Sequence, residues 1–165
     1  MLYSIKYQSP IGLCTIVSDG ESIVGIWLEG QKYFASTVCE EVVEDVMQPV
    51  LVAARGWLDD YFAGKNPAIA RLPLAPRGSV FRQTVWKLLC EIPYGETITY
   101  GALADRVAAV LEKENMSARA VGGAVGHNPI SIVIPCHRVV GFDGSLTGYA
   151  GGVERKRWLL ELERM

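Results

Sequence analysis

The sequence predicts an α+β protein with two regions, a small N-terminal antiparallel sheet with a helix and a mainly helical C-terminal region. Three observations predict this class. Short apolar runs separated by turn residues open the chain, apolar residues recur at helical spacing after residue 49, and a proline-rich stretch divides the two patterns.

The N-terminal elements begin with two predicted strands, Leu2–Tyr7 and Leu13–Val17, joined by the turn-rich stretch Ser9–Gly12. Asp19-Gly20 is a second hairpin signal, and the apolar run Ile23–Leu28 follows it. The acidic residues 40–46 are ambiguous and remain unassigned, because their pattern fits neither a helix nor a strand.

A helical pattern begins at Pro49 and ends at Gly64. Residues 66–78 then contain three prolines and a glycine, which cannot sustain a helix. We therefore expect a supporting domain over residues 1–76 and a second domain over residues 77–165.

The second domain opens with a helix that Ser79 can cap and that ends near Ile92-Pro93. Thr99 can cap the next helix, and Ser117 can cap a short segment over residues 118–125. Two helices joined by a short charged turn predict a helix-turn-helix.

The segment 118–125 has one long polar side chain, Arg119, in a row of small residues. Its glycine pair disfavours a helix interior by roughly 1 kcal/mol per glycine. Close packing against another helix explains such a row, and so does close approach to a nucleic-acid groove. The sequence leaves both explanations open.

Charge argues against a protein that holds nucleic acid by bulk electrostatics, since the net charge is −2. Residues 1–76 hold five Lys/Arg against nine Asp/Glu, and residues 77–165 hold eleven against nine. Any DNA contact should therefore fall in the second domain and neutralise few phosphates. No apolar run is long enough for a membrane span, and no secretory signal is apparent, so we expect a cytoplasmic protein.

The four cysteines are widely spaced and form no CxxC pair, and both histidines lie near the last of them. We therefore expect no metal site and, in a reducing cytosol, free thiols.

Cys136-His137-Arg138 carries the chemistry most worth testing. The apolar residues 132–134 predict a short strand that Pro135 ends, just before the cysteine. A thiolate nucleophile needs a proton acceptor or a positive charge, and the adjacent His137 and Arg138 could supply both, although neighbours in sequence need not touch. A buried cysteine beside a surface His-Arg pair explains the same residues.

The surrounding motifs resemble a known family, the O6-alkylguanine-DNA alkyltransferases. The likeness runs from Phe81 to Glu163 and includes Ile92-Pro93-Tyr94-Gly95-Glu96, Arg119-Ala120-Val121-Gly122, Asn128-Pro129, Ile134-Pro135-Cys136-His137-Arg138-Val139 and the Tyr149–Gly152 segment. Pro-Cys-His-Arg with this upstream Asn-Pro is highly specific. The N-terminal half is less similar.

The resemblance implies that Cys136 accepts an alkyl group permanently, so that each molecule reacts once and needs no cofactor. His137 would withdraw the thiol proton through a water, and Glu163 would orient His137. Tyr100 would donate its hydroxyl to a guanine ring nitrogen, although a core aromatic also suits that position. Asn128 would tie the helix-turn-helix to the loop before the cysteine.

The resemblance also implies a partner, double-stranded DNA containing O6-alkylguanine or, in some cases, O4-alkylthymine. Arg119 would fill the gap left by the extruded nucleotide, with the small residues around it allowing close approach through the minor groove. The remaining implied contacts to DNA and to the substrate base are those of Ser117, Ala120, Gly122, Val139, Tyr149 and Ala150.

Two departures from the familiar pattern bear on these contacts. Ala150 stands where some members have serine, so only its backbone N–H would reach the guanine oxygen. The turn near residues 110–115 is longer than in compact members. Two rival functions remain: a non-catalytic relative that binds alkylated bases, and a thiol hydrolase. The expected protein is a monomer that does not bind membranes.

Overall fold

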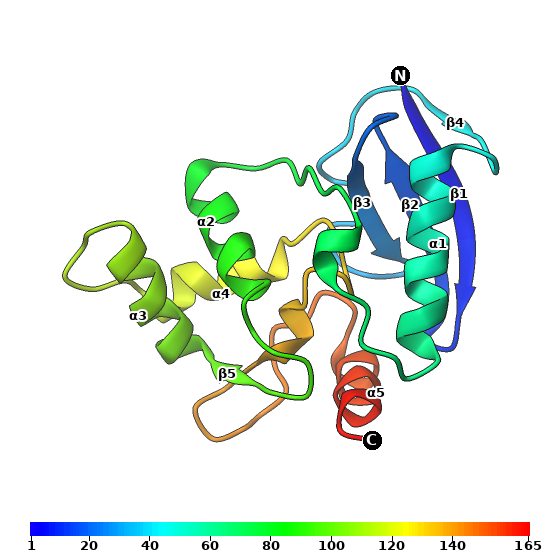
Figure 1. Cartoon of the computed structure of the whole chain (residues 1–165). Coiled ribbons are helices and arrows are strands. Elements are labelled where there is room, and N and C mark those ends of the chain that lie inside the picture. The colour runs from blue at the N-terminus through cyan, green and yellow to red at the C-terminus, as the bar shows by residue number, and fades with distance from the viewer. The chain divides into compact units, whose positions relative to one another are not determined.

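The structure, a computed structural model, describes all of residues 1–165, which form two compact units (Figure 1). Unit 1 contains residues 1–77, residues 129–133 and Met165, and unit 2 contains residues 78–128 and 134–164. The predicted α+β class is confirmed. None of the helices combines the length and the apolar character that crossing a bilayer requires.

Unit 1 is built on a four-stranded sheet with the order β3-β2-β1-β4. The strands β1 (Leu2–Ser9), β2 (Gly12–Ser18) and β3 (Ile23–Leu28) are antiparallel neighbours, as the turn signals predicted. The short edge strand β4 (Val42–Glu44) runs parallel to β1. This strand was not predicted from the sequence, because its three residues are exposed and show no alternation.

The helix α1 (Pro49–Phe62) packs against the first three strands, and a 3-10 helix, η1 (Ile69–Arg71), follows it. Gln48 caps α1 by accepting a hydrogen bond from the Leu51 N–H, and proline occupies the first helical position.

Unit 2 contains α2 (Val80–Leu89), α3 (Tyr100–Val110), α4 (Ala118–Gly126) and α5 (Val153–Glu163). Ser79, Thr99 and Ser117 cap the first three of these, each accepting a hydrogen bond from a backbone N–H one turn later. The helices α3 and α4 pack together as the predicted helix-turn-helix. Trp86 of α2 binds α4, donating its indole N–H to the Ala124 carbonyl at 2.8 Å.

Two short strands, β5 (Ile98–Thr99) and β6 (Val139–Val140), pair in parallel in unit 2, and a 3-10 helix, η2 (Cys136–Arg138), leads into β6. The strand predicted over residues 132–134 is wrong. Ile132 has a φ of +74°, and residues 131–133 form a turn. The apolar run misled because these residues are buried as a loop rather than as a strand.

Candidate active site

Cys136 lies at the first position of η2 and is 4 % exposed. Because β6 pairs in parallel with β5, the residues that follow the two strands lie at the same edge. Tyr100, at the start of α3, therefore lies near the chain that leaves β6. Its hydroxyl donates to the Thr147 carbonyl at 2.7 Å.

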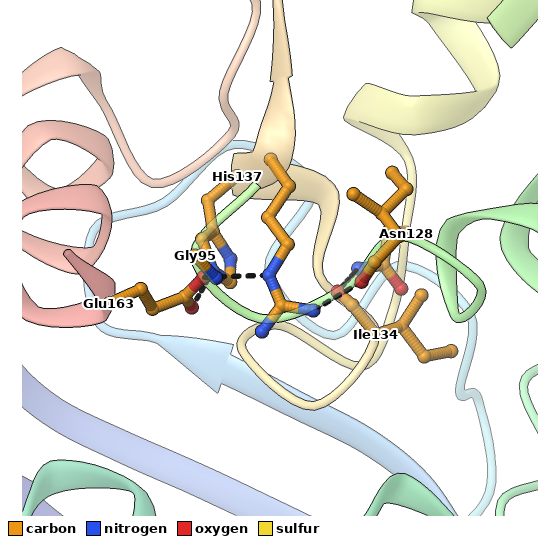
Figure 2. A network of polar contacts seen from close by, with 7 residues as sticks. Gly95, Asn128, Ile134, His137 and Glu163 are labelled. Atoms are coloured by element: carbon orange, nitrogen blue, oxygen red, sulfur yellow. Dashed lines mark hydrogen bonds and ion pairs between the residues drawn. The ribbon is translucent and has the colours of Figure 1, made fainter. Parts of the chain in front are cut away.

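Asn128 holds the backbone immediately before the cysteine. It directly follows α4 and its C-cap, and its side-chain amide donates to the Ile134 carbonyl at 2.9 Å (Figure 2). The same carbonyl accepts the N–H of Cys136 at 2.8 Å. Asn128 therefore links the chain that leaves α4 to the turn that carries the thiol.

Glu163 gathers three partners inside unit 2 (Figure 2). Its carboxylate contacts Nε2 of His137 at 2.5 Å and Nε of Arg138 at 2.7 Å, and accepts a longer hydrogen bond from the Gly95 N–H. Arg138 also donates to the Ile92 carbonyl at 2.7 Å. His137 and Glu163 are almost completely buried, so this is a fully enclosed charge network.

The network fixes the protonation state of His137. Although burial opposes ionisation of Glu163, its hydrogen bonds to His137 and Arg138 lower its pKa to about 2. An ionised carboxylate only accepts hydrogen bonds, so Nε2 of His137 carries the hydrogen. Burial lowers the pKa of His137, which keeps the ring neutral. Nδ1, buried and without a partner within the protein, is left with a lone pair that can accept a proton.

The thiol of Cys136 is protonated at rest. Burial raises its pKa, against the opposing effects of a hydrogen bond from Asn128 and the positive charge of Lys156. Arg138, the other residue that could have supplied a positive charge, does not do so, because its guanidinium is turned toward Glu163. A base is therefore needed to ionise the thiol, and a neutral His137 can supply it.

Lys156 is the residue that sequence analysis missed. It is completely buried, and its ammonium donates to the carbonyls of Val139 and Thr147 at 2.5 and 2.9 Å. It also lies 5.8 Å from the centre of the Tyr100 ring. Burial lowers its pKa to about 8. A lysine in a charged helical stretch reads as solvent-exposed, so no signal in the sequence alone pointed to it.

Tyr100 is held as a donor, because burial raises its pKa to about 12. Tyr149 is also buried, with its ring edge-on to His137 at a centroid distance of 6.5 Å. Val139 is buried, and Ala150 is half-buried and follows Tyr149 in the chain. Of the predicted substrate residues in this segment, the structure thus places Tyr149 beside His137.

The predicted DNA-binding residues lie on α4 instead. Arg119 is exposed and has no hydrogen bond or ion pair within the protein, and Ser117 and Ala120 are also exposed. Gly122 faces the Tyr100 ring, where an added Cβ would make only ordinary contact at 3.6 Å. A Cβ on Gly123 would meet nothing. Close internal packing therefore does not explain the glycine pair.

Both units match known protein families. Residues 80–165 match the family model described as "6-O-methylguanine DNA methyltransferase, DNA binding domain". Residues 2–76 match the model described as "6-O-methylguanine DNA methyltransferase, ribonuclease-like domain". The chain belongs to the 6-O-methylguanine DNA methyltransferase family.

Similar proteins support this membership over the full chain. A Haemophilus influenzae methylated-DNA–protein-cysteine methyltransferase is 45 % identical, covering 99 % of this chain and 87 % of the relative. A crystal structure of the Mycobacterium tuberculosis O6-methylguanine methyltransferase is 43 % identical, with a TM-score of 0.85 and coverage of 99 % and 93 %. A structure of Mycobacterium tuberculosis OGT in complex with DNA is 42 % identical, with a TM-score of 0.83 and coverage of 99 % and 92 %.

Proposed function

We propose that this protein repairs O6-alkylguanine in double-stranded DNA by moving the alkyl group, once and irreversibly, to Sγ of Cys136. The observation that carries the proposal is the buried pair of neutral His137 and ionised Glu163, directly after the buried Cys136 in the chain. In this pair Nε2 of His137 is bound to the carboxylate, and Nδ1 has no partner within the protein and can accept a proton. Family membership agrees with this chemistry.

The reaction balances without a cofactor. His137 takes the thiol proton through a bridging water, the sulfur bonds to the alkyl carbon, and the carbon–O6 bond breaks with its electron pair remaining on guanine. Tyr100 donates its hydroxyl proton to a guanine ring nitrogen as that negative charge builds. The proton removed from the thiol then restores the Tyr100 hydroxyl. A thioether has no route back to a thiol, so turnover ends there.

DNA binding is assigned to the helix-turn-helix. Arg119 has no internal partner and lies one turn before Gly123, which leaves open space on the helix, and this suits insertion into the minor groove while the damaged nucleotide is extruded. The relative solved with DNA supports this partner.

The protein is proposed to act as a monomer, since one chain supplies the whole network, and in the cytoplasm, where its four free cysteines stay reduced.

A relative that only binds alkylated bases needs neither a nucleophile nor a base, so Cys136 and its network argue against that alternative. Intact-mass measurement after incubation with a duplex containing O6-methylguanine tests the proposal. The wild-type mass should increase by one methylene unit, at a limit of one group per molecule. Cys136→Ser should abolish the increase. An unmodified wild-type protein, or repeated turnover as in a thiol hydrolase, contradicts the proposal.

A further inference from the structure

The loop before the active-site cysteine is anchored on the sheet of unit 1. Residues 129–133 belong to unit 1, although the chain on both sides of them belongs to unit 2. The backbone of Ile26 in β3 binds this loop twice. Its N–H donates to the Pro129 carbonyl at 2.9 Å, and its carbonyl accepts the Ser131 N–H at 3.0 Å.

The anchored loop holds a strained residue. Ile132 has a φ of +74°, and the Val133 N–H donates across it to the Ser131 carbonyl at 2.9 Å, which makes a γ-turn of the rare positive-φ kind. A β-branched residue strongly disfavours that conformation. Such strain persists only where the surrounding structure imposes it, and it concentrates at functional sites.

Gln31 supplies the constraint from the side. It is 8 % exposed, and its amide oxygen accepts hydrogen bonds from the Ser131 hydroxyl at 3.2 Å and the Leu28 N–H at 2.7 Å. Its own N–H donates back to the Leu28 carbonyl at 3.1 Å. Gln31 therefore joins the end of β3 to the residue that precedes the strained turn.

Only two tight turns separate this anchor from the thiol. After the turn at Ile132, a second turn places the Cys136 N–H on the Ile134 carbonyl, with Pro135 at its centre. No strand or helix lies between Ser131 and Cys136 that would fix the direction of the backbone independently of the first turn. We therefore expect a change at the first turn to shift the backbone that carries the sulfur.

We propose that Gln31 and Ser131 are positioning residues for alkyl transfer, which hold the strained Ile132 turn and thereby set the place of the Cys136 sulfur. This inference rests on the proposed function. It gives the acidic first domain a specific part in the reaction without a DNA surface. Because a small misplacement of a reacting atom costs a large factor in rate, Gln31→Leu should slow transfer about tenfold or more.

Gln48 offers a matched control. It has the same exposure of 8 %, accepts a hydrogen bond from a backbone N–H, donates to the Gly20 carbonyl and also lies in unit 1. Gln31→Leu and Gln48→Leu should therefore lose similar amounts of thermal stability. Under single-turnover conditions with saturating methylated duplex, only Gln31→Leu should lower the maximal rate, with the Kd for DNA unchanged in both.

Ser131→Ala keeps the inference testable if Gln31→Leu does not fold. It removes the same hydrogen bond and should slow transfer in the same direction, and the double variant should be no slower than Gln31→Leu alone. Equal maximal rates for wild type, Gln31→Leu and Ser131→Ala overturn the inference while leaving the proposed function intact. A wild type that gains no mass overturns the proposed function itself.

Discussion

The buried network of Glu163, His137 and Arg138 and the exposed face of α4 lie in the same unit and differ in how their charges are satisfied. In the network, Glu163 contacts His137 and Arg138, and Arg138 also reaches a backbone carbonyl. On α4, Arg119 is exposed and has no partner within the protein, and Gly123, one turn later, leaves open space where a side chain would be. The network needs no other molecule to hold its geometry, whereas the guanidinium of Arg119 on α4 can form hydrogen bonds or ion pairs only with another molecule.

The difference separates the residues that act in alkyl transfer from those that bind DNA and extrude the damaged base. A substitution in the network should slow transfer from any substrate, including a free alkylated base, because it acts on the thiol and its proton. A substitution on α4 should matter only when the base has to be taken out of a duplex. The following variants test that division, from the largest expected effect to the smallest.

Glu163→Gln should have the largest effect. An amide can donate to Nε2 of His137 and move the ring hydrogen to Nδ1, which removes the proton acceptor. We expect transfer to slow by roughly 10²- to 10⁴-fold on both duplex DNA and free O6-methylguanine, measured by intact mass against time. Arg138 would lose its buried counter-ion, so the free energy of unfolding should fall by about 3–5 kcal/mol.

Glu161→Gln is the control for that variant, because Glu161 lies on the same helix and is exposed. It should match the wild type in rate and stability. If Glu163→Gln, shown to be folded by circular dichroism, methylated itself at the wild-type rate, His137 would not be the base.

Arg119→Ala should separate the two substrates. We expect transfer from duplex DNA to slow by about tenfold or more, because extrusion of the nucleotide costs a few kcal/mol that the arginine helps to offset. Transfer from the free base should stay within about twofold, since the thiol network is untouched. Arg157→Ala, at an exposed arginine of α5, is the control. Equal losses on both substrates would contradict the extrusion role.

The elements of both units were predictable where local signals are strong. The capping residues Ser79, Thr99 and Ser117 mark their helix starts, since a cap acts within one turn. The strand expected over residues 132–134 failed because apolar composition reports burial and not backbone direction. Local patterns could not show which elements the loop would meet.

The site was also predictable only in part, because the sequence shows local motifs but not the contacts between distant segments. Motif resemblance supplied Cys136, His137 and Glu163, and the structure brings the last two into contact across 26 positions of sequence. The motif resemblance could not show which way the Arg138 side chain turns, or that Lys156 is buried, because both depend on packing between distant segments.

Lys156→Met should change the pH dependence of stability. The pKa of Lys156 falls from its ordinary 10.5 to about 8, so between these values the folded protein binds fewer protons than the unfolded chain. Stability from this group is therefore lowest below pH 8 and rises with pH. Relative to Lys156→Met, the wild type should gain about 1 kcal/mol of unfolding free energy between pH 7 and pH 9.

Chemical denaturation at each pH measures that gain, with Lys87→Met, at an exposed lysine of α2, as the control. Parallel curves for wild type and Lys156→Met would show that Lys156 keeps an ordinary pKa and is not buried as a charge.

Gly123→Ala should give the smallest effect and the sharpest contrast. An added Cβ meets no atom of the protein, so the substitution should stabilise the helix by up to about 1 kcal/mol. Gly123 lies one turn after Arg119 on the same face, where a methyl group would hold the helix away from the groove. We therefore expect the affinity for duplex DNA to fall about two- to fivefold, a modest contact loss, while transfer from the free base is unchanged.

Gly56→Ala is the control, because Gly56 lies in α1 and an added Cβ there also meets nothing. It should raise stability without altering DNA binding. If Gly123→Ala behaved in the same way as Gly56→Ala, the glycine pair would not serve DNA approach, and the division between a self-contained network and a partner-dependent helix face would rest on Arg119 alone.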